Sequence, residues 1–375
     1  MKKAMKLVSL VLAVVMLLGC LTACGSKSAT TDATASTDTA SNDTAAASDG
    51  GEIVIALISN TTGDYAQYGQ PVRDGAMLYI NQLNANGGIN GKQVKVLEYD
   101  DKGDGVEAVN AYNLACDNGI TAVFGATLTG TTIALADATY EDNMPQVTAS
   151  ATATGVTVID PADPESEIRP NVFRACFIDP YQGAAAATYA YKNLGYKKAA
   201  VLTDVANDYA VGLSNFFKKT FKKIGGELVA DMKYSSGDQD FTAQLSELIS
   251  KKPDIVFMPA YFAEGAIIMK QARELGATFV LMGADAMDNP DTLKIGGKAV
   301  EGFLHTTFPY DVNMENMSAE AKTFTDAWKK NYPNKDPSVN SALGYNCYNI
   351  ILDALTRAGK ADTEALTAAL AATKN

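Results

Sequence analysis

The stretch IVIALI, residues 53–58, and the segments that follow it decide the fold class of this 375-residue chain. Six apolar residues in a row predict a strand that is buried on both faces. Apolar residues then recur at helical spacing over 72–83, and the pair Gly87-Gly88 ends the predicted helix. A second strand is predicted at 94–99. A strand, a helix and a strand in this order indicate a parallel sheet with right-handed crossovers.

The same alternation of strand and helix continues along the rest of the chain. Helices are predicted at 108–115, 133–143, 321–330 and 343–358. Further strands are predicted at 122–125 and 146–148, near Val172, and at 199–202, 227–234, 254–258, 279–282 and 302–305. The sequence therefore predicts an α/β protein with parallel sheets that are flanked by helices.

A weak internal repeat divides these elements into two groups. Leu97-Glu98-Tyr99 opens a unit that reaches Val123-Phe124 after one helix. Met232-Lys233-Tyr234 opens a similar unit that reaches Val256-Phe257. We therefore expect two α/β lobes of like topology rather than one long sheet.

The expected division of the chain follows from this repeat. The helices predicted after His305 return to the first lobe, so the chain crosses between the lobes more than once. The predicted parts are a signal peptide at 1–23, a disordered tether at 24–50, a first lobe at 51–178 plus 306–375, and a second lobe at 179–305.

The first 50 residues have the composition of an export signal and a linker. Three lysines precede a short apolar run, 7–18, and a membrane-spanning helix needs about 20 apolar residues. Leu21-Thr22-Ala23 leads into Cys24 and resembles a bacterial lipobox, which implies that Cys24 is lipidated and becomes the mature N-terminus. Cys20 is a rival site, and an ordinary secretory signal is the alternative. The linker, 25–50, is almost entirely Ser, Thr, Ala, Asp and Gly, so it cannot bury a core.

Charge and composition exclude several classes of partner. The formal net charge is −12, and removing the signal lysines makes it more negative. This charge argues against nucleic acid and anionic lipid as partners of the folded part. After Cys24 three cysteines remain, namely Cys116, Cys176 and Cys347. An odd number is no disulfide framework, so buried thiols are expected, with a single pair as the alternative.

No motif in the sequence predicts a cofactor or a metal. Residues 87–92 have the wrong glycine spacing for a phosphate loop, and Lys102 and Ala111 occupy ligand positions of a calcium loop that would begin at Asp100. His305 is the only histidine, which argues against a histidine metal site or a catalytic relay. We expect His305 in the hinge or the core.

Residues that follow the predicted strands offer complementary chemistry. In an open parallel sheet, ligands bind outside the carboxyl ends of the strands. In the first lobe, 127–131 and 149–152 supply hydroxyls and helix N-termini, which suit a carboxylate. In the second lobe, Tyr261 and Asp285 supply a ring and an acid, which suit an ammonium group. The alternative is that these residues cap helices, with Asp285 capping the helix near Pro290.

The chain resembles the leucine/isoleucine/valine-binding family of ABC transporter substrate-binding proteins, which have the type I periplasmic-binding fold. The resemblance runs from Glu52 nearly to the end. Its markers are Ala66-Gln67-Tyr68-Gly69, Asn86 to Lys92, Tyr99-Asp100-Asp101, Ser150-Ala151-Thr152, Asp208-Tyr209 with Gly212, and Gln271-Ala272-Arg273 with Gly276. Similar proteins continue through a further hairpin, so the chain is expected to be truncated at Asn375.

The resemblance implies a role for each candidate site residue. Thr129, Ser150 and Thr152 would hold an amino acid head group, with Tyr261 beside them and Asp285 binding the ammonium group. The rings of Tyr68 and Tyr209 would border the side-chain pocket, and position 179 resembles a hinge. The family commonly has serine where Thr129 stands and proline where Ala149 stands.

The function expected from these observations is capture and delivery of a small molecule. A lipid-anchored, extracytoplasmic monomer would close its two lobes over a small amino acid, with branched-chain amino acids expected first, and would deliver it to an ABC permease. It would need no cofactor and bind no nucleic acid. A ligand-binding sensor and a binding protein for amides or small organic acids are alternatives. An enzyme is disfavoured because no nucleophile beside a base is visible.

Overall fold

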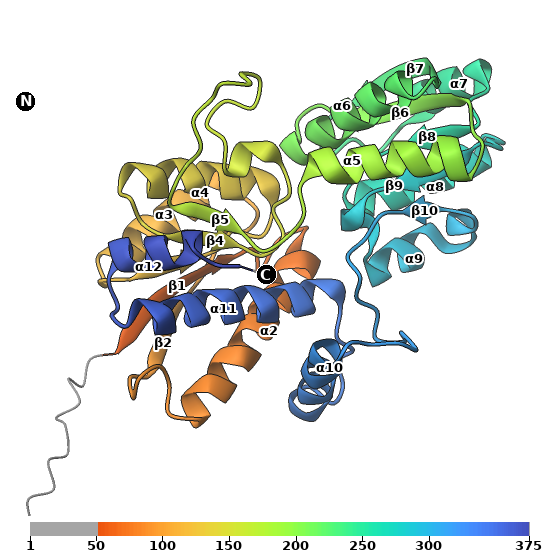
Figure 1. Cartoon of the computed structure of the whole chain (residues 1–375). Coiled ribbons are helices and arrows are strands. Elements are labelled where there is room, and N and C mark those ends of the chain that lie inside the picture. The colour runs from red at the N-terminus through yellow and green to blue at the C-terminus, as the bar shows by residue number, and fades with distance from the viewer. Residues whose placement is uncertain (1–51, 375) are drawn as a thin grey trace, which may run out of the picture. The chain divides into compact units, whose positions relative to one another are not determined.

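A computed structural model of the chain describes residues 52–374 (Figure 1). The predicted signal peptide, Cys24 and the tether lie outside the described residues. Among residues 52–374, no helix combines the length and the apolar character that crossing a membrane requires.

The first lobe is built on a five-stranded parallel sheet (Figure 1). Its strands are β1 (Ile53–Ser59), β2 (Val94–Asp100), β3 (Ala122–Phe124), β4 (Gln146–Thr148) and β5 (Val172–Arg174), in the order β2-β1-β3-β4-β5. The helices that accompany it are α2 (Ala66–Ala85), α3 (Gly105–Cys116), α4 (Thr129–Glu141), α11 (Val339–Ala358) and α12 (Thr363–Ala371). Helix α10 (Ala319–Asn331) packs against α2 and α11.

The second lobe repeats this arrangement. Its strands are β6 (Lys198–Asp204), β7 (Glu227–Tyr234), β8 (Ile255–Phe257), β9 (Val280–Gly283) and β10 (Leu304–His305), in the order β10-β9-β8-β6-β7. Its helices are α5 (Asp179–Thr188), α6 (Asp208–Lys223), α7 (Thr242–Lys251), α8 (Phe262–Glu274) and α9 (Pro290–Gly296). Read from the opposite edge, the strands follow the same chain order as in the first lobe, which confirms the like topology.

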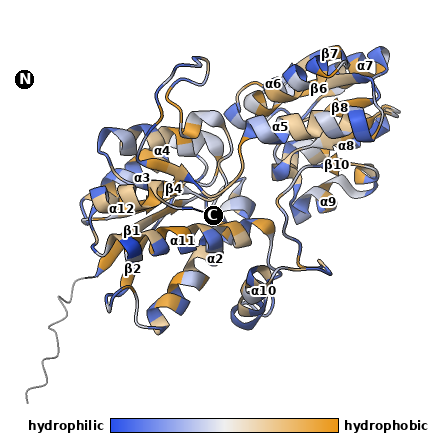
Figure 2. Cartoon of the chain, in the orientation of Figure 1, coloured by the Kyte–Doolittle hydropathy of each residue, from blue (hydrophilic) through white to orange (hydrophobic). Residues whose placement is uncertain are grey.

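The cores follow from the apolar strands. In β1 only Val54 retains partial exposure, because the strand pairs with a neighbour on each side and has helices on both faces of its sheet. Figure 2 shows the strands coloured mainly as hydrophobic, whereas the helices carry both hydrophobic and hydrophilic residues. This arrangement explains why continuous apolar runs, rather than alternating ones, mark the strands in the sequence.

Two glycines bring α2 and α11 into backbone contact. A Cβ atom on Gly75 would lie 2.0 Å from the carbonyl oxygen of Ser341, and a Cβ on Gly344 would lie 2.0 Å from that of Val72. Only glycine fits at such distances. The chain segment after the second lobe is thereby fixed against the first lobe.

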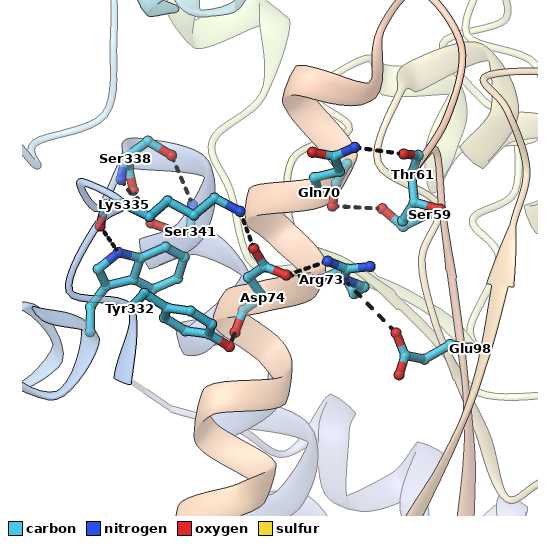
Figure 3. Close-up of polar contacts among 12 residues, drawn as sticks. Ser59, Thr61, Gln70, Arg73, Asp74, Glu98, Tyr332, Lys335, Ser338 and Ser341 are labelled. Atoms are coloured by element: carbon cyan, nitrogen blue, oxygen red, sulfur yellow. Dashed lines mark hydrogen bonds and ion pairs between the residues drawn. The ribbon is translucent and has the colours of Figure 1, made fainter. Parts of the chain in front are cut away.

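A buried carboxylate holds the start of α11 (Figure 3). Asp74, on α2, is 6% exposed and accepts hydrogen bonds from Arg73 at 2.6 Å and from the ammonium group of Lys335. The Tyr332 hydroxyl donates to the main-chain oxygen of Asp74 at 3.3 Å. Since Lys335 lies three residues before the helix-capping residue Ser338, these bonds position the first turn of α11.

Two expectations from the sequence need correction. His305 is exposed in β10 and its ring stacks on that of Phe303, so the interpretation as a core residue is wrong. The three cysteines of the described region are free thiols, so the alternative of a single disulfide is wrong. Cys347 is buried, but Cys116 and Cys176 are only partly buried.

Candidate functional site

A cavity lies between the two lobes at the carboxyl ends of their strands. The space between its lining atoms is about 430 Å³, and part of this space is open to solvent. It is lined by Tyr68, Thr127, Leu128, Thr129, Ser150, Tyr209, Tyr261, Asp285, Ala286, Phe308, Val339 and Asn340. Six of the seven predicted ligand-binding residues therefore meet at one cavity, and the exception is Thr152.

The first lobe supplies hydroxyl groups and a helix N-terminus to this cavity. Thr129 is the first residue of α4 and is buried, and within residues 52–374 its hydroxyl forms no hydrogen bond. The Ser150 hydroxyl donates to the main-chain oxygen of Thr127 at 2.8 Å. The hydroxyl of Thr127 pairs with that of Ser59 at 2.8 Å. A carboxylate fits here because the exposed N–H groups of a helix start attract negative charge.

Thr152 lies behind the cavity wall rather than on it. Its side chain is fully buried, and its hydroxyl faces the carboxylate of Asp179, whose charged form it stabilises. Neither oxygen of Asp179 makes a hydrogen bond of normal geometry within the described chain. Burial, reinforced by the nearby charge of Asp285, raises the pKa of Asp179 to about 7.

The second lobe supplies a carboxylate among tyrosines. Asp285 Oδ1 accepts hydrogen bonds from Gln182 Nε2 at 2.8 Å and from the Tyr209 hydroxyl at 2.9 Å. Burial raises the pKa of Asp285, although these two bonds act in the opposite direction. A cationic group in the cavity would favour the charged form of this carboxylate.

Asp285 does not cap the helix that follows it. The side chain of Asn289 accepts the hydrogen bond from the N–H of Asp291 at the start of α9, at 2.9 Å. Asp285 instead opens the short 3-10 turn η3 (Asp285–Met287) and makes no capping bond there. The helix-cap interpretation of Asp285 is therefore wrong.

Tyrosine rings form the wall that joins the lobes. The ring of Tyr261 lies 5.6 Å from that of Tyr209, 5.5 Å from that of Tyr68 and 4.8 Å from that of Tyr65. Tyr65 also donates a hydrogen bond to Glu264 Oε1 at 2.8 Å, from the first lobe to the second. Rings of this kind provide apolar contact area and an electron-rich face for a cation.

Several site residues were not predicted from the sequence. Gln182 contacts Asp285, and Phe308, Val339 and Asn340 line the cavity. The last three come from the segments that return to the first lobe. No strand end marks Val339 and Asn340, but Phe308 lies three residues after β10, where the rule for strand ends could have found it. For Asp179 the resemblance implies only a hinge position. The only signal for Gln182 was its position three residues after that hinge.

The described residues offer no evident metal centre. Within 52–374, no group of three or more His, Cys, Asp or Glu side chains is placed to hold a metal ion. The polar groups of the cavity are instead hydroxyls, one amide and one carboxylate, which suit an organic ligand.

Comparisons with known proteins agree with this geometry. A model of the periplasmic binding protein family matches residues 52–374. The Leu/Ile/Val-binding protein BraC3 of Rhizobium johnstonii is 31% identical over 321 residues, which cover 85% of this chain and 83% of that protein.

Two solved structures share the fold. The leucine-binding protein LivK of Thermotoga maritima superposes with a TM-score of 0.78 and 37% identity, over 86% of this chain and 88% of that one. The branched-chain amino acid transporter substrate-binding protein LivJ of Streptococcus pneumoniae, solved in complex with isoleucine, superposes with a TM-score of 0.77 and 30% identity, over 87% and 89% of the two chains. The chain therefore belongs to the periplasmic binding protein family, with the two-lobed type I fold.

Proposed function

We propose that this chain captures a small amino acid by closing its lobes and delivers it to an ABC permease. Among amino acids, we expect the branched-chain ones to be the preferred ligands. The proposal rests on one observation: the two sides of the cavity suit ligand groups of opposite charge. Thr129, at the N-terminus of α4, suits a carboxylate, and Asp285 suits an ammonium group. A zwitterionic head group satisfies both sides at once.

The remainder of the wall supports an aliphatic side chain. Leu128, Phe308 and Val339 contribute apolar surface to the cavity. The names of the relatives, which refer to leucine, isoleucine and valine, support the same class of ligand. Binding without chemistry is supported by the relatives, which are named as binding proteins.

The proposal extends to the division of the chain and its location. We take 51–178 plus 306–375 and 179–305 as the two ligand-binding lobes, a division supported by the membership of the two sheets. Periplasmic binding proteins act outside the cytoplasm. A lipid anchor at Cys24, which rests on the sequence alone, would hold such a protein at the membrane surface as a monomer.

A ligand panel and one substitution test the proposal. Calorimetric titration would compare L-leucine, L-isoleucine and L-valine with small amides and with 4-methylpentanoate, which is leucine without its amino group. Asp285→Asn should weaken amino acid binding by a hundredfold or more, because the ammonium group loses its anionic partner in a desolvated site. The melting temperature of the empty protein should barely change, since an amide oxygen still accepts the bonds from Gln182 and Tyr209.

A neighbouring acid provides the control. Asp288→Asn removes the same charge three residues later, where the carboxylate faces Thr307 and does not line the cavity. It should leave amino acid affinity within a few-fold of the original. Preferred binding of amides or of 4-methylpentanoate, or an unchanged affinity in Asp285→Asn, would reject the zwitterion in favour of the amide or organic acid alternatives.

A further inference from the structure

Gln182 uses both ends of its side-chain amide on one partner. Its Nε2 donates to Asp285 Oδ1 at 2.8 Å, and its Oε1 accepts from the main-chain N–H of Asp285 at 2.9 Å. The side chain is 2% exposed. The main chain and the carboxylate of Asp285 are therefore both fixed by a single residue of α5.

This arrangement leaves one oxygen of Asp285 for a ligand. Both the Gln182 and the Tyr209 bonds go to Oδ1. Within the described chain, Oδ2 forms no hydrogen bond to another residue and Asp285 lines the cavity. A carboxylate with one oxygen held by two donors cannot rotate freely, so its second oxygen has a defined direction.

Gln182 also connects the two places where the chain changes lobe. It lies in the first turn of α5, three residues after Asp179, where the chain enters the second lobe. Its Oε1 accepts a second hydrogen bond, at 2.5 Å, from the hydroxyl of Thr306, which follows β10 where the chain leaves that lobe. The position of Asp285 is thus tied to both crossing segments.

We infer that Gln182 is the positioning residue that aims Asp285 at the ammonium group of the ligand and thereby sets the preference for a free amine. The inference rests on the proposed function, in which Asp285 binds that group. An amide suits this position because its Nε2 donates to the carboxylate while its Oε1 accepts from two donors, and it carries no charge.

The test separates positioning from simple structural support. Titration and competition in the full-length protein give the affinities for two ligands. One is the amino acid of the panel that binds best, expected to be L-leucine, and the other is its analogue without the amino group, 4-methylpentanoate for leucine. In Gln182→Ala, the Kd for leucine should rise by 10- to 100-fold, whereas that for 4-methylpentanoate should change by less than about threefold. Equal losses for both ligands would overturn the inference, because a structural role would not distinguish them.

A buried glutamine in the first lobe serves as the matched control. Gln146 is fully buried in β4, donates to the main-chain oxygen of Gly125 at 2.8 Å and accepts from the hydroxyl of Thr139 at 2.7 Å. Gln146→Ala should lower the melting temperature and leave the ratio of the two affinities unchanged. A change of ratio as large as that in Gln182→Ala would also overturn the inference.

A double-mutant cycle distinguishes this inference from the proposed function. In the Asp285→Asn background, Gln182→Ala should change leucine affinity by less than about threefold, because the positioned charge is already gone. If Asp285→Asn alone leaves binding intact, the proposed function fails. If Asp285→Asn weakens binding and Gln182→Ala does not, only the positioning role of Gln182 fails.

Discussion

The hydroxyl of Tyr68, in the first lobe, accepts a hydrogen bond at 2.9 Å from the main-chain N–H of Phe262, in the second lobe. The same hydroxyl donates to the main-chain oxygen of Ala286 at 2.7 Å. Tyr68 is 4% exposed, so both bonds are shielded from water. One phenolic oxygen therefore holds two elements of the second lobe, the start of α8 and η3, against α2.

Removing that oxygen should favour the open arrangement of the lobes. Tyr68→Phe leaves the N–H of Phe262 and the carbonyl of Ala286 without a partner when the lobes close, which costs about 1–3 kcal/mol. Amino acid affinity should therefore fall by about 10- to 100-fold, as measured by calorimetry. Small-angle scattering should show a more open empty protein.

The control for Tyr68→Phe uses the same substitution on the same helix. The Tyr79 hydroxyl donates to Asn349 at 2.8 Å, from α2 to α11 within the first lobe. Tyr79→Phe should leave both affinity and scattering unchanged. If it lowers affinity as much as Tyr68→Phe does, the bonds of Tyr68 have no special role in closure.

The carboxylate of Asp74 should contribute more to stability than an exposed ion pair does. Asp74→Ala removes the acceptor of Arg73 and of Lys335 in a buried position and should lower the free energy of unfolding by about 2 kcal/mol. Asp326→Ala, in an exposed pair with Lys322, should change it by less than about 0.5 kcal/mol. Urea unfolding of both variants checks the contrast, and equal effects would contradict it.

The buried acid Asp179 should make stability depend on pH. Its folded-state pKa, about 7, lies above the ordinary value of 3.8, so the folded protein binds a proton that the unfolded chain has released. The stabilisation that this bound proton provides is complete below about pH 4 and is lost as the pH rises to about 7. Over that range the free energy of unfolding should fall by up to about 1.4 kcal/mol per pH unit. Unfolding at several pH values should show a smaller decline in Asp179→Asn than in the original protein. Asp117→Asn, at an exposed position, should retain the full decline, and an undiminished decline in Asp179→Asn would contradict the assignment.

The fold could be predicted closely because its signals are local. The apolar run at 53–58 and the glycine pair after α2 mark a buried strand and a helix end, and both occur where the sequence indicates. The repeat between β2 and β7 identified two sheets of the same strand order. Strand lengths were less accurate, since β10 spans only Leu304–His305 although four residues were expected.

The rule for strand ends identified several site residues, and the resemblance added Tyr68 and Tyr209, which lie in helices. Asp285 and Tyr261 lie in the loops just after strands of the second lobe, β9 and β8, so the rule for parallel sheets identified them. Gln182 lies inside a helix, and only the packing of α5 against η3 and the crossing segment brings it to Asp285. Thr152 was placed in the pocket by resemblance, but its side chain faces Asp179 instead of the cavity. Such contacts depend on tertiary structure that no local pattern encodes.

The proposed anchor at Cys24 predicts a change of location. Cys24→Ala should release the protein from the membrane fraction, because stable attachment depends on the lipid chains and not on the tether. Fractionation followed by immunoblotting measures the release, with Cys20→Ala as the matched control that should stay in the membrane. Retention of Cys24→Ala together with release of Cys20→Ala would assign the anchor to Cys20, and retention of both would remove lipidation from the proposal.

The ring of Phe308 should limit the size of the ligand side chain. It lines the cavity and stacks on Phe177 with ring centres 4.0 Å apart and an interplanar angle of 11°. Phe308→Ala removes apolar contact for leucine and opens space beside Val339, so binding of leucine should weaken while that of phenylalanine strengthens relative to it. The ratio of the two affinities, measured by titration, should shift by at least tenfold.

A second aromatic neighbour of Phe177 controls for effects on the crossing segment. The ring of Tyr181 lies 6.5 Å from that of Phe177, but Tyr181 is 68% exposed and does not line the cavity. Tyr181→Ala should therefore leave the ratio of leucine to phenylalanine affinity unchanged. If Tyr181→Ala shifts the ratio as much as Phe308→Ala does, selectivity comes from the conformation of the crossing segment. If neither substitution shifts it, the ligand side chain lies elsewhere, against Leu128 and Tyr68, and Phe308 serves only to pack the hinge.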